Sequence, residues 1–273
     1  MDFTLKKYRE LLVALQDNGY ATLTFAEYIQ GNQPAKFVIL RHDVDKLPKN
    51  SLATARIENS LGIKSSYYFR AVPESWDDRI IKEITSLGHE AGYHYESLTT
   101  CNGDMAAAMQ DFKTNLKRLR ELTPVATICM HGSPRSKWDS KDLWKSNSYR
   151  DLGIIGEPYF DVDFSDVFYL TDTGRRWDGF KMSVRDKIPV HQERWCREGL
   201  VFHSTNDILS ALNDGRLPHH IMITTHPQRW NNKTIPWIKE VLLQNTKNLV
   251  KRILIKSRLQ LHRFSNVFYD ILA

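Results

Sequence analysis

Short apolar runs alternate with longer amphipathic segments along most of the chain. Apolar side chains recur every three to four residues in the longer segments, which predicts helices at residues 4–17, 51–61, 77–87, 103–122, 139–152 and 208–212. The short runs are apolar and bounded by turn residues, which predicts strands at residues 37–40, 66–69, 90–94, 125–130, 167–170 and 221–225. Strands that alternate with helices pair in parallel, so we expect an α/β fold. This many units in one chain predict a distorted or incomplete (β/α) barrel of about seven strands.

The chain contains no linker, repeat or low-complexity tract, so we expect one domain over residues 1–273. The barrel core is expected at about 37–230, followed by a basic helical extension at 231–273. In this extension apolar side chains recur at helical spacing from Ile235 to Leu261, with basic residues on both borders of the stripe. The stripe could pack on the barrel, or it could lie on an anionic membrane surface.

Charge and cysteine content narrow the expected partners and compartment. Lys and Arg number 38 against 32 Asp and Glu, but no nucleic-acid-binding motif accompanies this excess, so we expect no nucleic-acid partner. Cys101, Cys129 and Cys196 are isolated from one another, which suits reduced thiols. The first 16 residues lack the uninterrupted apolar core of a secretory signal. We therefore expect a cytoplasmic protein, with the terminal helix as a potential contact to the inner face of a membrane.

Side chains that can carry chemistry gather where predicted strands end. Arg41-His42-Asp43-Val44-Asp45 follows the strand at 37–40, and such crowded carboxylates call for a cation or a shared proton. In an extended chain Asp43 and Asp45 point to the same side. Three further strand ends carry His, Asp or Glu: Tyr93-His94-Tyr95-Glu96, Met130-His131-Gly132-Ser133-Pro134 and Thr224-Thr225-His226-Pro227. Because the carboxyl ends of barrel strands share one rim, these segments predict one joint site.

These segments resemble the motifs of the polysaccharide deacetylase family, also called the NodB homology or carbohydrate esterase 4 family. The resemblance runs from about residue 37 to 230. Four segments carry it, in the order that the family has: His42-Asp43-Val44-Asp45, Gly88-His89-Glu90-Ala91-Gly92-Tyr93-His94, His131-Gly132-Ser133-Pro134 and Ile221-Met222-Ile223-Thr224-Thr225-His226.

The chain departs from the family pattern at three places. Val44 separates two aspartates that are adjacent in typical members, and Leu98 stands where a second metal-binding His is usual. His131 replaces the Arg of the third motif. The chain thus resembles a divergent branch that we associate with bacterial surface-polysaccharide clusters, lipopolysaccharide biosynthesis among them.

The resemblance implies a metal-dependent hydrolase that removes an N-linked or O-linked acyl group of the acetyl type from a sugar. We expect a carbohydrate deacetylase that acts on carbon–nitrogen (amide) bonds. The expected substrate is an acylated amino sugar of a nucleotide- or lipid-linked polysaccharide precursor. Asp45 and His94 would bind the metal, with His131 as the third ligand; Glu96 is the alternative ligand or a partner of the ligands. We expect zinc, with iron and manganese as alternatives. Asp43 would act as base and His226 as acid.

Two further expectations concern residues around this site. Asp172, Arg175 and Trp177 follow the strand at 167–170 and combine charge with an aromatic face, so we expect them to contact the sugar. His42 and His89 are expected to be structural. The alternative function is a catalytically inactive carbohydrate-binding relative, since the residue at position 98 removes one metal ligand of the family.

Overall fold

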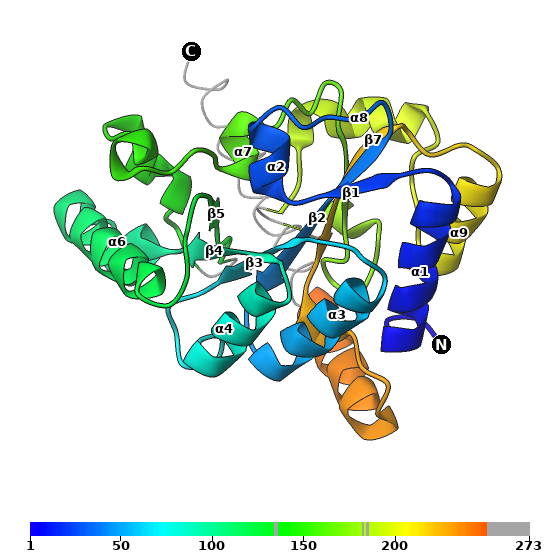
Figure 1. Cartoon of the computed structure of the whole chain (residues 1–273), viewed down its shortest axis with the longest axis horizontal. Coiled ribbons are helices and arrows are strands. Elements are labelled where there is room, and N and C mark those ends of the chain that lie inside the picture. Colours follow the sequence, from blue (N-terminus) through cyan, green and yellow to red (C-terminus); the bar gives the residue numbers. More distant parts are fainter. Residues whose placement is uncertain (134–135, 182, 184–185, 250–273) are drawn as a thin grey trace, which may run out of the picture.

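The computed structural model describes residues 1–133, 136–181, 183 and 186–249, and its centre is one curled parallel sheet with helices packed around it (Figure 1). Seven strands form the sheet: β1 Ala21–Leu23, β2 Phe37–Val44, β3 Ser66–Phe69, β4 Glu90–Tyr95, β5 Ile128–Met130, β6 Phe168–Thr171 and β7 His220–Thr225. Their order is β5-β4-β3-β2-β7-β6, and β1 pairs with the first residues of β2. The predicted α/β class and the distorted barrel are confirmed.

The central strand β2 is longer than the sequence predicted. It continues through Val44, so His42 and Asp43 lie within the strand. Its side chains are buried along the whole length. Its main chain is paired on both edges, with β7 on one side and with β1 and then β3 on the other. The first candidate motif is therefore held by the main-chain hydrogen bonds of the sheet as far as Val44, and Asp45 follows the strand directly.

Helices cover the sheet between the strands. They are α1 Leu5–Asp17, α2 Phe25–Ile29, α3 Pro48–Ser60, α4 Asp78–Ser86, α5 Ser97–Thr100, α6 Met105–Arg120, α7 Pro158–Asp161, α8 Pro189–Arg197 and α9 Thr205–Asn213, and residues 234–249 are also helical. Thr4, Asp77 and Asp104 cap α1, α4 and α6 by accepting hydrogen bonds from main-chain N–H groups. Within the described residues, no helix is both long and apolar enough to cross a membrane.

One predicted helix is replaced by two shorter elements. The segment 139–152 forms the 3-10 helices η1 Ser140–Lys145 and η2 Tyr149–Leu152; η3 Gly179–Lys181 and η4 Pro227–Arg229 are two more. Between the first two, the Asn147 side chain donates to the Leu143 carbonyl and the Ser148 side chain caps η2. These short polar side chains compete with the main chain for hydrogen bonds, which interrupts an α-helix.

The packed core begins before residue 37. Phe3 and the α1 residues Tyr8, Leu12 and Leu15 are buried against β2, β6 and β7, and a second cluster packs β3, β4 and β5 against α4 and α6. At the other end, residues 234–249 bury Gln244 and Asn248 and expose Ile235, Ile238, Leu242, Leu243 and Leu249. Of the two alternatives for this stripe, packing on the barrel is therefore wrong for these five side chains, and the predicted helix at 250–261 lies outside the described residues.

Candidate metal centre and active site

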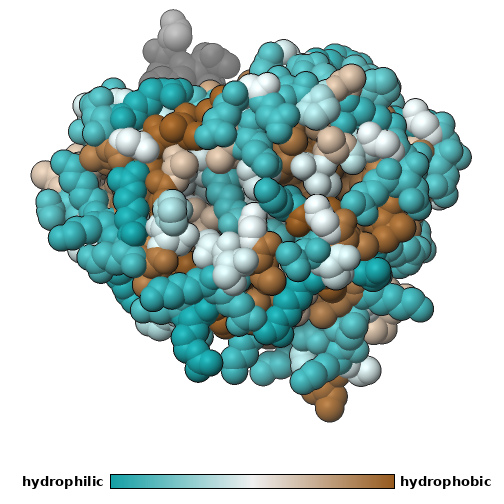
Figure 2. All heavy atoms as spheres, in the orientation of Figure 1, coloured by the Kyte–Doolittle hydropathy of each residue, from teal (hydrophilic) through white to brown (hydrophobic). Residues whose placement is uncertain are grey.

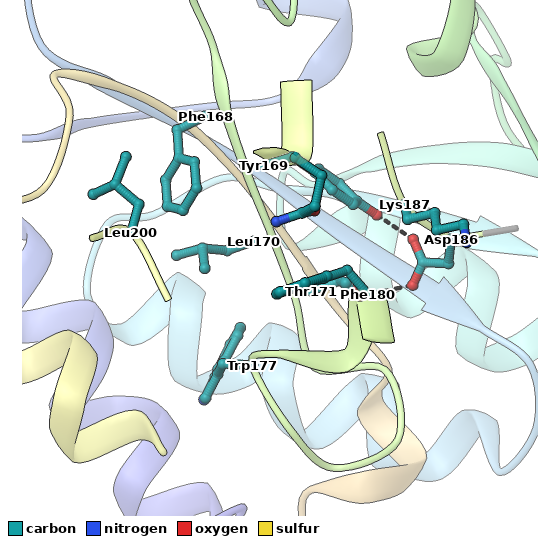
Figure 3. Close-up of a pocket in the computed structure, with 10 residues that line it drawn as sticks. Phe168, Tyr169, Leu170, Thr171, Trp177, Phe180, Asp186, Lys187 and Leu200 are labelled. Carbon is teal, nitrogen blue, oxygen red and sulfur yellow. Dashed lines mark hydrogen bonds between the residues drawn. The ribbon is translucent and has the colours of Figure 1, made fainter. Parts of the chain in front are cut away.

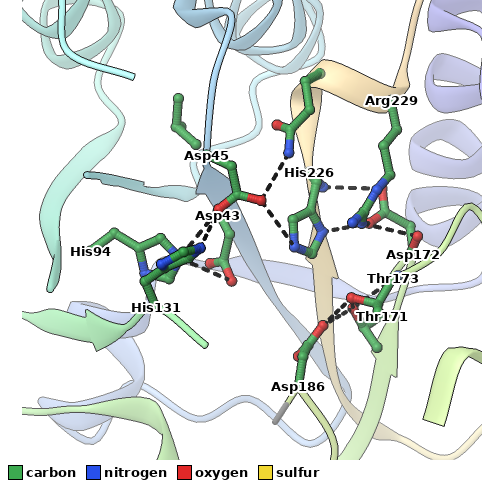
Figure 4. Close-up of polar contacts among 12 residues, drawn as sticks. Asp43, Asp45, His94, His131, Thr171, Asp172, Thr173, Asp186, His226 and Arg229 are labelled. Carbon is green, nitrogen blue, oxygen red and sulfur yellow. Dashed lines mark hydrogen bonds and ion pairs between the residues drawn. The ribbon is translucent and has the colours of Figure 1, made fainter. Parts of the chain in front are cut away.

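The carboxyl ends of three strands bring the predicted metal ligands together (Figure 4). Asp45 follows β2, His94 lies near the end of β4, and His131 follows β5. One ligand atom from each of these residues lies within 4.8 Å of the others. The three segments are separated by about 35 to 50 residues in sequence, and parallel pairing places them at one edge of the sheet.

His94 presents a free ring nitrogen to this centre. Its Nδ1 lies 2.9 Å from the Cys129 carbonyl oxygen, which can only accept, so Nδ1 carries the hydrogen. Burial lowers the pKa of His94 to about 4, and the ring is therefore neutral at neutral pH. Its Nε2, left with a lone pair, lies 3.7 Å from Asp45 Oδ1.

His131 is oriented in the same way by a carboxylate. Its Nδ1 lies 2.7 Å from Glu96 Oε2, and Arg70 donates two hydrogen bonds to Glu96 Oε1 at 2.9 and 2.6 Å. Burial alone would raise the pKa of Glu96, but His131 and Arg70 outweigh it and lower that pKa to about 2. Glu96 is thus ionised and binds the side of the His131 ring away from Asp45. Of the two predicted roles for Glu96, the geometry favours the partner of a ligand.

The Asp45 oxygen between the two rings fits a cation. Oδ1 is buried and has no hydrogen-bond partner among the described residues, and it lies 3.5 Å from His131 Nε2. Three electron-pair donors thus face one another with no hydrogen between them when both rings are neutral, which is costly without a positive charge. Ligands about 2.1 Å from a tetrahedral zinc ion are roughly 3.4 Å apart, close to the spacing here. The residues present therefore fit a divalent metal.

A second group with similar spacing fits a metal less well. Ligand atoms of Asp43, His94 and Cys129 also lie within 4.8 Å of one another. However, both Asp43 oxygens accept hydrogen bonds from Arg41, at 2.8 and 2.6 Å. Burial raises the pKa of the Cys129 thiol well above its usual value, so the thiol stays protonated and is a poor ligand.

Asp43 is an ionised carboxylate beside the metal ligands. Burial would raise its pKa, but the Arg41 guanidinium and the nearby His94 hold that pKa well below its usual range. Its Oδ2 lies 3.7 Å from His94 Nε2, so Asp43 is adjacent to the metal centre. The two hydrogen bonds from Arg41 hold its carboxylate in this orientation.

His226 faces Asp45 from the β7 side of the site. Its Nε2 lies 3.9 Å from Asp45 Oδ2, and its Nδ1 lies 2.6 Å from Asp172 Oδ1 (Figure 4). Burial and Arg229 lower the pKa of His226, whereas Asp172 and Asp45 raise it, and the net shift is upward. The protonated ring is thus more favourable than in a free imidazole, which suits a proton donor.

A cleft of about 570 Å³ opens beside these residues, a size that suits a sugar. Gln228, which donates to Asp45 Oδ2 at 3.0 Å, lies in its wall. Charged and polar residues line it: Asp45, Lys46, Arg70, Glu74, His131, Gln228, Arg229, Glu240, Gln244 and Lys247.

The three residues expected to contact the sugar lie outside this lining. Asp172 is fully buried, and Arg229 and Trp230 also donate to it, at 2.5 and 2.8 Å. Trp177 packs in the core, where Figure 3 shows it near Leu170, and the cavity there is only about 10 Å³, room for one water. Arg175 lies over the rings of Phe3 and Trp237. The geometry argues against direct sugar contact by any of them.

Two residues of the site were not singled out from the sequence. Arg70 follows β3 directly, so the strand-end argument applied to the predicted strand at 66–69 would have found it. Gln228 lies two residues beyond His226 in a turn that begins at Pro227, and nothing in its sequence context marks it.

Comparison with known proteins finds solved structures that are similar at low sequence identity. No family model matches the sequence, and no curated protein matches it. Among solved structures, a CE4 family pseudoenzyme of Bacillus anthracis, BA3943, is 12% identical with a TM-score of 0.42, over 78% of this chain and 61% of that one. A mutant of that pseudoenzyme is 14% identical with a TM-score of 0.38, over 79% and 63% of the two chains. PdaA of Bacillus subtilis, described as a family 4 carbohydrate esterase, is 12% identical with a TM-score of 0.37, over 87% and 84%.

Proposed function

We propose that the protein is a divalent-metal-dependent hydrolase that removes an acyl group from the nitrogen of a sugar. The observation that carries this proposal is the set of three electron-pair donors, Asp45 Oδ1, His94 Nε2 and His131 Nε2, that no hydrogen bond among the described residues explains. Zinc suits this mixed Asp and His set, and iron or manganese are the alternatives.

The reaction adds water to the acyl carbon and breaks the carbon–nitrogen bond, giving a carboxylic acid and an amine. A cation held by Asp45, His94 and His131 would polarise the acyl carbonyl and make a water more acidic. Asp43 accepts the proton of the attacking water. Arg41 fixes both Asp43 oxygens and keeps this carboxylate ionised, so it stays available as an acceptor at neutral pH.

His226 supplies the second proton transfer, from the opposite side of Asp45. It holds a proton at Nε2 and donates it to the departing amine. Asp172 accepts from Nδ1 and from the main-chain N–H of His226, at 2.6 and 3.0 Å, so it fixes both the ring and the main chain that carries it. Asp172 is thus a positioning residue for the acid.

The cleft supports an anionic substrate. Lys46, Arg70, Arg229 and Lys247 line it together with Glu74, Glu240 and Asp45. With a divalent cation bound, the balance of charge in the cleft is positive, which favours a sugar linked to phosphate. A nucleotide- or lipid-linked amino sugar of a surface-polysaccharide precursor fits this requirement.

Metal content and hydrolysis test the proposal together. Protein purified without chelators should carry about one equivalent of zinc, iron or manganese, and Asp45→Asn and His94→Ala should lose it. Asp163→Asn, an exposed carboxylate outside the site, should retain it. The metal-loaded protein should release acetate from N-acetylated nucleotide sugars and leave a free amino group on the sugar.

The alternative is a carbohydrate-binding protein without activity. A bound metal content below about a tenth of an equivalent, which addition of zinc, iron or manganese does not raise, would exclude the hydrolase. Sugar binding by such a metal-free protein, measured by calorimetry, would then establish the inactive relative.

A further inference from the structure

The terminal helix carries an exposed apolar stripe. Ile235, Ile238, Leu242 and Leu249 are 80%, 46%, 63% and 60% exposed. At 100° per residue these four side chains fall within an arc of about 60°. Figure 2 shows hydrophobic residues at the lower tip of the molecule, where this helix projects in Figure 1. These four apolar side chains are therefore exposed along one face of the helix.

The opposite face of the same helix packs on the protein with polar side chains. Gln244 and Asn248 are buried, and the Asn248 amide donates to the Gly174 carbonyl at 2.9 Å. Glu240 pairs with Lys46 at 3.3 Å, and Trp237 Nε1 donates to the Asp2 carbonyl at 2.8 Å. A surface helix ordinarily buries its apolar stripe and exposes its polar face. Here the orientation is reversed, so the apolar stripe is available to a partner.

The charge of the segment indicates what kind of partner it takes. Residues 231–263 contain eight Lys or Arg and a single acid, Glu240, which Lys46 already neutralises. The formal charge of the whole chain is +6, so the excess of positive charge lies in this segment and the rest is close to neutral. An anionic surface complements this segment, whereas pairing with a second copy would bring two strongly basic segments together.

We propose that the stripe of Ile235, Ile238, Leu242 and Leu249 docks on a lipid surface with anionic head groups. Apolar side chains enter the boundary between head groups and acyl chains, while neighbouring lysines remain at the level of the phosphates. Each lysine near an anionic surface strengthens this attraction about fivefold. Lys239 is an exposed cation of the described helix next to this stripe, and Lys233 lies exposed in the bend just before the helix.

Docking in this way fixes the position of the cleft relative to the membrane. The inference about substrate that follows from this position rests on the proposed function. Glu240, Gln244 and Lys247 line the cleft from the side of the helix away from the stripe. The helix would therefore lie between the membrane and the cleft, and the cleft wall that it forms would be about one helix diameter, roughly 10–12 Å, from the head groups. A sugar attached to a lipid in the membrane would be held close to the cleft at this distance. The position therefore favours a lipid-linked amino sugar over a nucleotide-linked one.

Vesicle flotation with the full chain tests the docking. Wild-type protein should float with vesicles of phosphatidylcholine and phosphatidylglycerol in a 7:3 ratio, float poorly with phosphatidylcholine alone, and lose affinity as salt is raised. The double variant Ile238→Ser, Leu242→Ser should bind the anionic vesicles at least tenfold more weakly. Val190→Ser in α8, an equally apolar side chain that is 85% exposed, should bind as the wild type does.

Circular dichroism and metal content of each variant separate this result from misfolding and from failure of the proposed function. Equal vesicle binding by the wild type and the folded double variant would overturn the proposal, as would absence of binding by the wild type. If light scattering instead showed a dimer that the double variant dissociates, without vesicle binding, the stripe would be an interface between two copies and the lipid proposal would fail.

Discussion

At the scale of single residues, the hydrogen bonds of two histidines decide whether the site can hold a cation. The Cys129 carbonyl and the Glu96 carboxylate take the Nδ1 hydrogens of His94 and His131, which leaves both Nε2 atoms directed at Asp45. Neither ring has to rotate or change tautomer to bind a metal. The site is therefore preorganised, which lowers the free-energy cost of metal binding.

For Asp172 the sequence predicted the position of the residue but not its partner. Its place after the strand at 167–170 was sufficient to put it at the correct rim. The pairing of β6 with β7 then sets Asp172 beside His226, with its main-chain N–H donating to the Thr224 carbonyl at 3.1 Å. The order of the strands in the sheet is not encoded locally, so the sequence could not show that Asp172 faces His226 rather than a sugar.

Removal of the His226 imidazole separates proton transfer from metal binding. His226→Ala should retain the metal and lose about 10²–10⁴-fold in kcat, because the departing amine would leave without a proton donor. Metal analysis and steady-state kinetics on one preparation measure both. His219→Ala, an exposed histidine before β7, is the matched control and should turn over normally. Undiminished kcat in His226→Ala would show that another group is the acid.

At the scale of secondary-structure elements, strand ends were the most predictable feature. Each apolar run ends where the chain meets the rim, and that boundary is visible in the sequence. The direction of the residue after the run is less predictable, as Glu96 shows. An extended chain would point Glu96 the same way as His94, but β4 ends at Tyr95 and α5 begins at Ser97. Glu96 occupies the position before this short helix with φ −141° and ψ 23°, and its side chain turns to the far side of His131 without capping the helix.

Close packing around β4 ties the position of His94 to Gly92, two residues earlier. A Cβ at Gly92 would lie 2.4 Å from Tyr68 Cε1 and 2.8 Å from the Thr127 carbonyl oxygen. The Tyr68 ring has little freedom to move, because its hydroxyl is hydrogen-bonded to Thr127 Oγ1 at 2.9 Å. An added methyl group must therefore displace β4 relative to its neighbours.

Gly92→Ala should lower the free energy of unfolding by about 1–3 kcal/mol, the usual cost of overpacking, and should also weaken metal binding. Urea denaturation and competition with a chromophoric chelator measure the two effects. Gly19→Ala is the control, since φ +78° makes a side chain strained there while nothing lies within 4 Å of the new Cβ. It should lose stability without losing metal affinity. Wild-type metal affinity in Gly92→Ala would contradict the link between β4 packing and the site.

At the scale of the whole molecule, one buried carboxylate joins segments from the first third of the chain. Glu58 of α3 is fully buried, and its Oε1 lies 2.7 Å from His42 Nε2 and accepts from Tyr8 of α1. Its Oε2 accepts from Ser65 at 2.6 Å and from Tyr67 at 2.7 Å, and His89 lies 3.6 Å away. His42 and His89 are structural in this network, as the sequence analysis expected. Glu58 itself could not be found from the sequence, where it is one more charged residue in an amphipathic helix.

This network makes stability depend on pH in a direction that follows from the pKa of Glu58. Burial would raise that pKa, but His42 and the other hydrogen-bond donors outweigh it and lower the pKa from 4.5 to about 2. A carboxyl group with a lowered pKa in the folded state stabilises the fold above its ordinary pKa. That stabilisation is lost as the pH falls from 4.5 toward 2, because the unfolded chain then binds the proton first.

Glu58→Gln should therefore lower the free energy of unfolding by about 3 kcal/mol at pH 7 and should flatten its decline between pH 4.5 and 3. The measurement is urea denaturation of chelator-treated protein across this pH range, so that metal release does not contribute. Glu83→Gln removes an exposed carboxylate that pairs with Arg56 and should stay within about 0.5 kcal/mol of the wild type at every pH. If the free energy of unfolding fell with pH in parallel for Glu58→Gln and the wild type, the acid sensitivity would come from other carboxylates. Protonation of the buried network would then not be what weakens the contacts among α1, α3 and the central strands.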